Sequence, residues 1–115
     1  MAPAIAVCAS VTRVDVRNNN IAGDGASQLS TAVLGNTTIE IFNEIPIKEM
    51  RTDSFTTLDL KKKYIGVEGG MVVADLLPAM ASLTRLDVEV NFLGEEGKAV
   101  LRKVVESRSG FELKL

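Results

Sequence analysis

Three stretches of this chain share one pattern of residues, and that pattern limits the fold more than any other feature of the sequence. Residues 11–25, 55–69 and 83–97 read VTRVDVRNNNIAGDG, FTTLDLKKKYIGVEG and LTRLDVEVNFLGEEG. When each block is numbered from one, apolar residues occupy positions 1, 4, 6 and 11, and glycine occupies position 15 after an acidic residue. Alternating apolar residues are typical of a short strand with one buried face. Each block therefore predicts a strand, a turn and the start of a helix.

Two shorter matches extend the pattern. The segment 38–41 fits positions 3 to 6, and the segment 111–113 fits positions 4 to 6. Position 4 then recurs at Val14, Ile39, Leu58, Leu86 and Phe111, with one short step from Ile39 to Leu58. Spacings mostly in the twenties with this signature are those of leucine-rich repeats. A doubly wound nucleotide-binding sheet is the competing interpretation, but its units need roughly 30 residues or more, and no Gly-rich phosphate loop follows any predicted strand.

Each position of the block has a predicted role. Positions 4 and 6 point inward from the strand, and positions 3, 5 and 7 point to the opposite face. Asparagine at position 9, as in Asn19 and Asn91, can bond backbone groups of the loop and of the neighbouring repeat. Lys63 holds that position in the middle block, so we expect the bond to be missing or replaced there. The apolar side chain at position 11 is expected to point inward and to anchor the turn.

Helical periodicity follows the blocks, at residues 24–34, from about residue 68 onward, and at 95–106. Pro78 should end or kink the middle helix. Acidic residues near the helix starts suit the helix dipole and are interpreted as helix caps; they are Asp24, Glu68, Glu95 and Glu96. Residues 42–54 are too few for a full helix and return, so one repeat is truncated. There we expect at most one helical turn, a turn packed by Ile45 and Ile47, and a bend or thinning of the stack.

The segment Asp87–Lys98 also resembles a calcium-binding loop of the EF-hand type. Its first, third and fifth residues could supply oxygen ligands; they are Asp87, Glu89 and Asn91. The sixth residue, Phe92, disfavours the sharp turn that glycine allows, and Lys98 stands where the bidentate glutamate belongs. We predict no metal or cofactor at this loop.

Composition removes several functional classes. A chain of 115 residues forms one domain, here 1–115. A net charge of −2 disfavours unspecific nucleic-acid binding, and no apolar stretch approaches the ~20 residues that span a membrane. The single cysteine, Cys8, predicts a buried thiol and a reducing, cytoplasmic compartment. Without any histidine the chain lacks the commonest acid–base catalyst, so we expect no enzymatic activity.

From residue 11 to residue 115 the chain resembles the ribonuclease-inhibitor-like class of leucine-rich repeat proteins. The motif N-x-[IL]-x-x-[DE]-G after the strand carries this resemblance, and the second repeat departs from it. The resemblance implies a short right-handed horseshoe of the α/β class, with parallel strands on the concave side and helices on the convex side. It also implies a protein partner bound by the concave face. A second implied function is a regulatory fragment of a GTPase-stimulating protein, which would use a loop arginine such as Arg51 or Arg108.

The outward strand positions are the candidate binding residues. Position 3 supplies Arg13, Thr38, Thr57 and Arg85; position 5 supplies Asp15, Glu40, Asp59 and Asp87; position 7 supplies Arg17, Phe42, Lys61 and Glu89. An exposed Phe42 beside arginines would be typical of a binding hot spot. The alternative is that arginine and aspartate pair with one another across the strands, and that Phe42 turns inward in its irregular repeat.

Repeat stacks need polar caps at both ends. The apolar residues 4–7 are interpreted as part of an N-terminal cap, whereas the strand within FELKL has no following segment to cover its edge. An open edge invites pairing with another chain. The sequence therefore predicts a fragment of a longer array, self-association through an open end, or an edge protected by its shortness and by Lys114.

Overall fold

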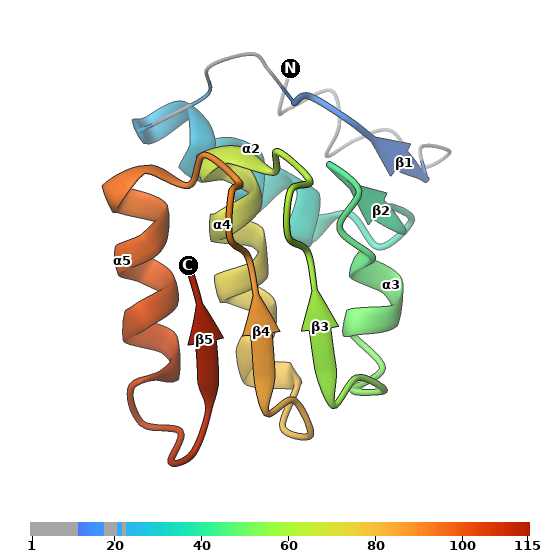
Figure 1. Ribbon diagram of the computed structural model, residues 1–115. Coiled ribbons are helices and arrows are strands. Elements are labelled where there is room, and N and C mark those ends of the chain that lie inside the picture. The colour runs from blue at the N-terminus through green and yellow to red at the C-terminus, as the bar shows by residue number, and fades with distance from the viewer. Residues whose placement is uncertain (1–11, 18–20, 22) are drawn as a thin grey trace.

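The computed structural model describes residues 12–17, 21 and 23–115 of the chain. Strands form one layer and the longer helices form a second layer behind them (Figure 1). In chain order the elements are β1 (Arg13–Val14), α2 (Gly23–Gly35), β2 (Ile41–Phe42), α3 (Ile47–Met50), β3 (Thr57–Asp59), α4 (Gly66–Leu76), the 3-10 turn η1 (Leu77–Ala79), β4 (Arg85–Asp87), α5 (Gly94–Val105) and β5 (Glu112–Lys114). The predicted α/β class with parallel strands is confirmed.

The described strands are all parallel and form two small sheets. One sheet pairs β1 with β2, and the other has the order β3-β4-β5. Leu58 pairs with Leu86, and Leu86 pairs with Leu113, so the two steps along the chain are nearly equal. The step from Val14 to its partner Phe42 is as long as that from Leu58 to Leu86. The step from Phe42 to Leu58 is much shorter, and their strands belong to different sheets. At the segment predicted to be truncated, between β2 and β3, the sheet is therefore interrupted.

Two predicted registers are wrong. The partner of Val14 is Phe42 rather than Ile39, and the partner of Leu86 is Leu113 rather than Phe111. Ile39 is buried all the same, with 1% of its surface exposed, but it precedes the strand. The segment from Ile39 to Ile45 offers several apolar residues close together, so its apolar pattern does not fix which of them joins a two-residue strand.

The predicted helices are confirmed within about one or two residues. The middle helix α4 ends at Leu76 and tightens into the turn η1 at Pro78, as a proline predicts. The truncated repeat holds the single helical turn α3, and Ile45 and Ile47 are both fully buried beside it. Predictions that fall on Cys8, Asn19 and residues 4–7 lie outside the described residues.

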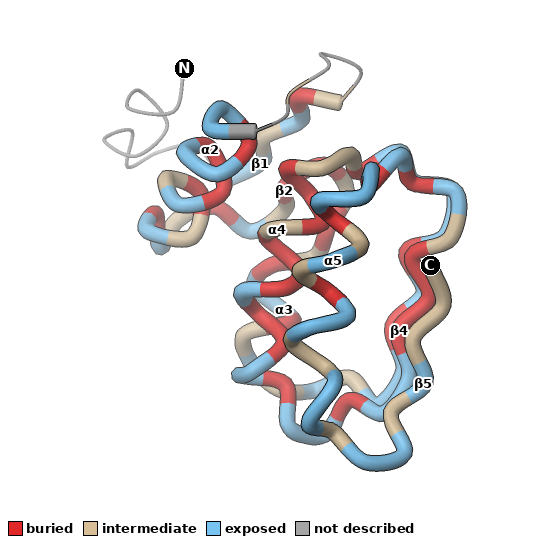
Figure 2. The backbone as a smooth tube through the Cα atoms, turned by 90° about the vertical axis from the view of Figure 1, so that its left-hand side faces the viewer, coloured by how far each residue is buried: buried red, intermediate tan, exposed pale blue. Residues whose placement is uncertain are grey.

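Helix α4 packs between α2 and α5, and glycines allow its close approach to α5. A methyl group at Gly70 would lie 3.6 Å from the Cα atom of Gly97 and 3.0 Å from the Cδ2 atom of Leu93. Buried residues line the space between the helices and the strands (Figure 2), and they form one apolar core that includes Phe42, Ile65, Leu86 and Leu101. Among the described helices, none is long and apolar enough to cross a membrane.

Candidate functional site

The outward side chains of β3 and β4 form a polar surface, which we call the strand face. It consists of Thr57, Asp59, Lys61, Arg85 and Asp87, and these residues surround a shallow hollow of about 250 Å³. The register places Thr57 beside Arg85 and Asp59 beside Asp87. Of the predicted binding residues, the structure therefore brings together Thr57, Asp59, Lys61, Arg85 and Asp87.

The predicted acidic stripe has a structural role. In Asp15, Asp59 and Asp87 the Oδ1 atom accepts a hydrogen bond from the backbone N–H two residues later, at 3.1, 3.0 and 3.1 Å. Each of these aspartates therefore shapes the turn that follows a strand. Asp87 is only 6% exposed, so its prediction as an open binding residue is wrong. Asp59 remains exposed and available.

Ion pairs cover the far edge of the strand face. The Arg85 guanidinium lies 3.2 Å from the Glu112 carboxylate on the adjacent β5, and the Lys114 ammonium lies 3.9 Å from the same carboxylate. All three side chains are about half exposed, so water screens these pairs and a partner can replace them at little cost. The cluster orders the edge of β5 without closing it to a partner.

The outward residues of β1 form a separate charge cluster. The guanidinium of Arg17 contacts the Asp15 carboxylate at 2.8 Å and the Glu44 carboxylate at 3.8 Å, and Arg13 pairs with Glu44 as well. The hydrogen bond from Arg17 lowers the pKa of Asp15 below its ordinary value. Arg17 and Asp15 thus pair with one another within one segment, and not across neighbouring strands as the alternative interpretation predicts. Arg17 also donates to the Lys63 carbonyl at 2.9 Å, which ties β1 to the loop after β3.

In the second repeat the predicted binding residues do not form a face. Phe42 is fully buried, so its prediction as an exposed anchor is wrong. In the observed register Phe42 pairs with Val14 of β1, so its side chain points toward the core. Thr38 and Glu40 precede β2: Thr38 bonds the Asn36 side chain. Glu40 lies 3.8 Å from the Lys48 ammonium at the exposed surface.

Asn91 performs the role predicted for position 9. Its Oδ1 accepts from the N–H groups of Lys63 and Ile65, at 2.9 and 3.3 Å. Its Nδ2 donates to the carbonyls of Leu60 and Val88, both at 2.8 Å, and to that of Glu89 at 3.2 Å. Asn91 is 2% exposed, so these bonds fix two adjacent loops in a dry environment.

Lys63 stands where the other blocks have an asparagine. Bonds of the kind expected from that asparagine are made here by Asn43, directly after β2, which sequence reasoning overlooked. The buried Asn43 accepts from the Val16 N–H at 2.8 Å and donates to the Ile65 carbonyl at 3.1 Å. It also donates to the Glu68 carboxylate at 3.2 Å. Asn43 therefore connects the segment after β1 to the start of α4, as Asn91 connects the loops after β3 and β4. An asparagine directly after an apolar run is the signal that identifies it.

Glu68, Glu95 and Glu96 lie in the first turns of α4 and α5, as predicted, although the N-cap residues of both helices make no side-chain capping bond. Glu95 and Glu96 are exposed. Only 4% of Glu68 is exposed, and burial raises the pKa of its carboxyl group above the ordinary value of 4.5. Its carboxyl group bonds its own backbone N–H and also accepts from Asn43, so it joins the start of α4 to the polar cluster around Asn43.

Sequence reasoning also missed a group of exposed apolar side chains. Tyr64, Val90 and Phe92 lie on the loops after β3 and β4 with 46%, 56% and 69% of their surface exposed. Tyr64 and Phe92 both occupy position 10 of their blocks and stack with ring centroids 5.4 Å apart. A large apolar residue recurring at a loop position is the signal that could have revealed them.

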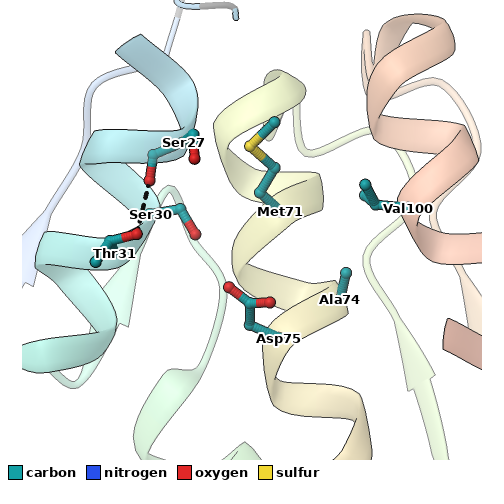
Figure 3. A pocket seen from close by; sticks show the side chains of 7 residues that line it. All are labelled: Ser27, Ser30, Thr31, Met71, Ala74, Asp75 and Val100. Atoms are coloured by element: carbon teal, nitrogen blue, oxygen red, sulfur yellow. Dashed lines mark hydrogen bonds between the residues drawn. The ribbon is translucent and has the colours of Figure 1, made fainter. Parts of the chain in front are cut away.

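The helix layer holds a small groove of about 200 Å³ between α2, α4 and α5. Figure 3 shows Ser30 of α2 and Asp75 of α4 facing one another, with Val100 of α5 on the other side of α4. The Ser30 hydroxyl is buried without a hydrogen-bond partner. The groove offers hydroxyls and one carboxylate, which are too few polar groups for acid–base or nucleophilic chemistry.

The described residues contain no group of three or more Cys, Asp or Glu side chains placed to hold a metal ion. Both loop arginines of the alternative function are held by backbone carbonyls. Arg51 donates to the Leu34 carbonyl at 2.9 Å. Arg108 donates to the carbonyls of Leu77 and Met80 and lies over the Phe111 ring.

Comparisons with known proteins add no family to this geometry. Protein-family models, curated proteins and solved structures all gave no significant match to the chain. The function is therefore inferred from the strand face, the loops and the charge clusters of the molecule.

Proposed function

We propose that this chain is a non-enzymatic protein-binding module of the leucine-rich repeat type, and that its strand face contacts the partner. One observation carries the proposal. The β3 and β4 strands lie in register, with Leu58 beside Leu86, and each directs apolar residues inward and polar residues outward. Such a surface is polar, and buried hydrogen bonds in the adjoining loops hold it in place. These properties suit the recognition of another protein.

The exposed charges of this face support the same proposal. Thr57, Asp59, Lys61 and Arg85 are all exposed, and the hollow among them is wide enough for a side chain of a partner. Arginine is enriched among the residues that dominate binding energy. The β1 cluster of Arg13, Asp15 and Arg17 is committed to internal pairing, so we place the contact on β3 and β4.

No observation favours the alternative of a regulatory arginine. Arg51 and Arg108 each use their guanidinium groups to bond carbonyls near the ends of helical segments. An arginine that stabilises a transition state in another protein must be free to reach it. Self-association through the short β5 edge, which carries Lys114, remains a second way in which this module could find a partner.

A crosslinking experiment tests the strand face. A photoreactive amino acid replaces Arg85 in one protein and the exposed Arg102 of α5 in another, and both are irradiated in an extract of the source cells. We expect a discrete adduct from the Arg85 position alone. The variant Asp59→Asn removes the charge but keeps the oxygen that accepts from the Lys61 N–H, so it should weaken that adduct with little change in the unfolding midpoint. Equal adducts from both positions, or an adduct only from α5, would contradict the proposal.

A further inference from the structure

The loops after β3 and β4 carry a surface of which the proposed function uses Lys61 alone. Both loops leave the sheet at the same end of the strands (Figure 1). Tyr64, Val90 and Phe92 are the exposed large apolar residues of the described chain, and all three lie on these loops. Three exposed lysines, at positions 61–63, precede Tyr64. We call this set of six residues the loop edge.

The backbone at the loop edge does not favour these side chains. Lys62, Tyr64, Val90 and Phe92 have φ angles of 60°, 58°, 57° and 53°. Glycine and asparagine adopt this left-handed region readily, whereas a β-branched or bulky residue there is a clear outlier. Stability alone would favour Gly or Asn at these positions. Bulky residues held in such a conformation, with their side chains in solvent, point to a function outside folding.

Stacking between the aromatic rings does not account for the exposure. Tyr64 and Phe92 meet at an interplanar angle of 18°, so each ring covers one face of the other. Phe92 is still 69% exposed, and Val90 takes no part in the stack. The outer ring faces are therefore open to solvent, and the exposed Val90 lies two residues before Phe92 on the same loop. Rigid aromatic side chains of this kind dominate binding energy when a partner excludes water from them.

The adjacent charges define the chemistry of the partner. Within the described residues, Lys61, Lys62 and Lys63 form no ion pair, although the chain as a whole carries a net charge of −2. Glu89 and Glu95 flank the second loop. A continuous polyanion or an anionic membrane would meet these carboxylates as well as the lysines. A short peptide can place its acidic residues over the lysines alone.

We propose that the loop edge binds an acidic segment of a partner protein, which sets an apolar side chain against Tyr64, Val90 and Phe92 and its carboxylates against the lysines. The two loops are held in place from below by Asn91, which bonds the N–H groups of Lys63 and Ile65 and the carbonyls of Val88 and Glu89. The surface is thus ordered before the partner arrives, and little conformational entropy is lost on binding.

Fluorescence anisotropy with defined peptides tests this proposal. The probe is a short fluorescein-labelled peptide of glutamates around one leucine and one phenylalanine. Two comparison peptides replace either the glutamates by lysines or the apolar residues by serines. We expect binding of the first peptide alone, and a dissociation constant that rises with salt because the lysines are exposed.

Variants identify the residues responsible. Asparagine tolerates a positive φ, so the double variant Tyr64→Asn and Phe92→Asn should fold at least as stably as the natural chain while it weakens peptide binding at least about tenfold. Changing Lys61, Lys62 and Lys63 to glutamine should also weaken binding and remove its salt dependence. Arg85→Ala, on the strand face, should leave it unchanged, so this result is independent of the proposed function.

Several results would overturn the proposal. These are no binding of the acidic peptide, equal binding of the lysine peptide, or undiminished binding by the Tyr64→Asn and Phe92→Asn variant. Vesicles containing phosphatidylserine form a further arm of the experiment. If the vesicles bind in a manner that depends on Tyr64 and Phe92 and the peptide does not, the loop edge serves a membrane surface rather than an acidic protein segment.

Discussion

The two halves of the molecule hold their strands together in different ways. In the C-terminal half, residues 57–115, three strands pair at nearly equal steps along the chain, and successive repeats use the same positions for pairing. In the N-terminal half, residues 12–50, two short strands pair, and the next strand belongs to a separate sheet. With a regular spacing, the same residue positions pair with one another in each successive strand. Where the spacing shortens, between β2 and β3, the strands do not pair and side chains connect the two sheets.

The two buried asparagines show this difference most directly. Asn91 connects neighbouring repeats of the regular half, through backbone groups of both its own loop and the loop after β3. Asn43 connects the two halves, because it bonds Val16 on one side of the break and Ile65 and Glu68 on the other. Arg17 adds a second link through the Lys63 carbonyl. The break in the sheet is thus bridged by side chains instead of by a strand ladder.

Removing Asn91 should have the largest effect. Asn91→Ala removes the amide that bonds the N–H groups of Lys63 and Ile65 and the carbonyls of Leu60 and Val88, while the Glu89 carbonyl keeps its bond from the Lys62 N–H. This should lower the free energy of unfolding by about 3 kcal/mol. Urea unfolding followed by circular dichroism measures this loss. A loss of less than about 1 kcal/mol would show that water replaces the amide, and that the regular half does not depend on Asn91.

Removing Asn43 should have a smaller and more local effect. Asn43→Ala breaks three bonds, of which those to Ile65 and Glu68 cross the junction, and we expect a loss of about 2 kcal/mol. Hydrogen exchange should show reduced protection of the Val16 amide and of β2, with the amides of Leu60 and Leu86 affected less. Asn91→Ala is the matched comparison and should reduce protection in the regular half. Equal loss in both halves after Asn43→Ala would mean that the molecule unfolds as one unit, and that the distinction between the halves is wrong.

The sequence predicted β3 and β4 of the regular half well, but it misplaced the register of β5 and of the strand at the junction. Leu58, Leu60, Leu86 and Val88 alternate with polar residues, so their inward orientation follows from the pleat of a strand alone. Around β2 the apolar residues Ile39, Ile41, Phe42 and Ile45 do not alternate regularly with polar ones, so the apolar pattern alone does not select one register. The register there is chosen by backbone bonds such as Asn43 N–H to the Val14 carbonyl, at 2.8 Å, which no apolar pattern encodes.

The candidate site was predictable to the same limited extent. The outward orientation of Asp59, Lys61 and Arg85 follows from strand alternation. The burial of Asp87 depends on neighbours in three dimensions, and so does the exposure of Tyr64 and Phe92, since both loops must stack before the rings meet. Glu68 looks like an ordinary first-turn acid in the sequence, and only the packing of the two halves buries it.

The helix layer offers a further comparison, because α2 of the first half packs there against α4 of the second. Ser30 is 2% exposed, and its hydroxyl has no partner. Ser30→Ala should therefore stabilise the fold by about 1 kcal/mol, since it removes a buried polar group that makes no bond. Ser27→Ala, at an exposed position on the same helix, should change stability by less than about 0.5 kcal/mol. Destabilisation by Ser30→Ala would show that this hydroxyl finds a partner in solution.

The smallest expected effect at any one pH comes from Glu68, and its pH dependence tests the junction. Burial raises the pKa of the Glu68 carboxyl, so the folded state binds its proton more tightly than the unfolded state does. Its contribution to stability is then fully present below the ordinary pKa of 4.5 and is lost as the pH rises through the raised value. Glu68→Gln cannot ionise, so its stability relative to the natural chain should increase with pH over this window and then level off. Urea midpoints across the acid range measure the difference, and an NMR titration of the Glu68 side chain locates its pKa directly. A difference that stays constant with pH, or a side-chain midpoint at or below 4.5, would mean that water reaches the junction and that the two halves meet less closely than the buried Asn43–Glu68 contact requires.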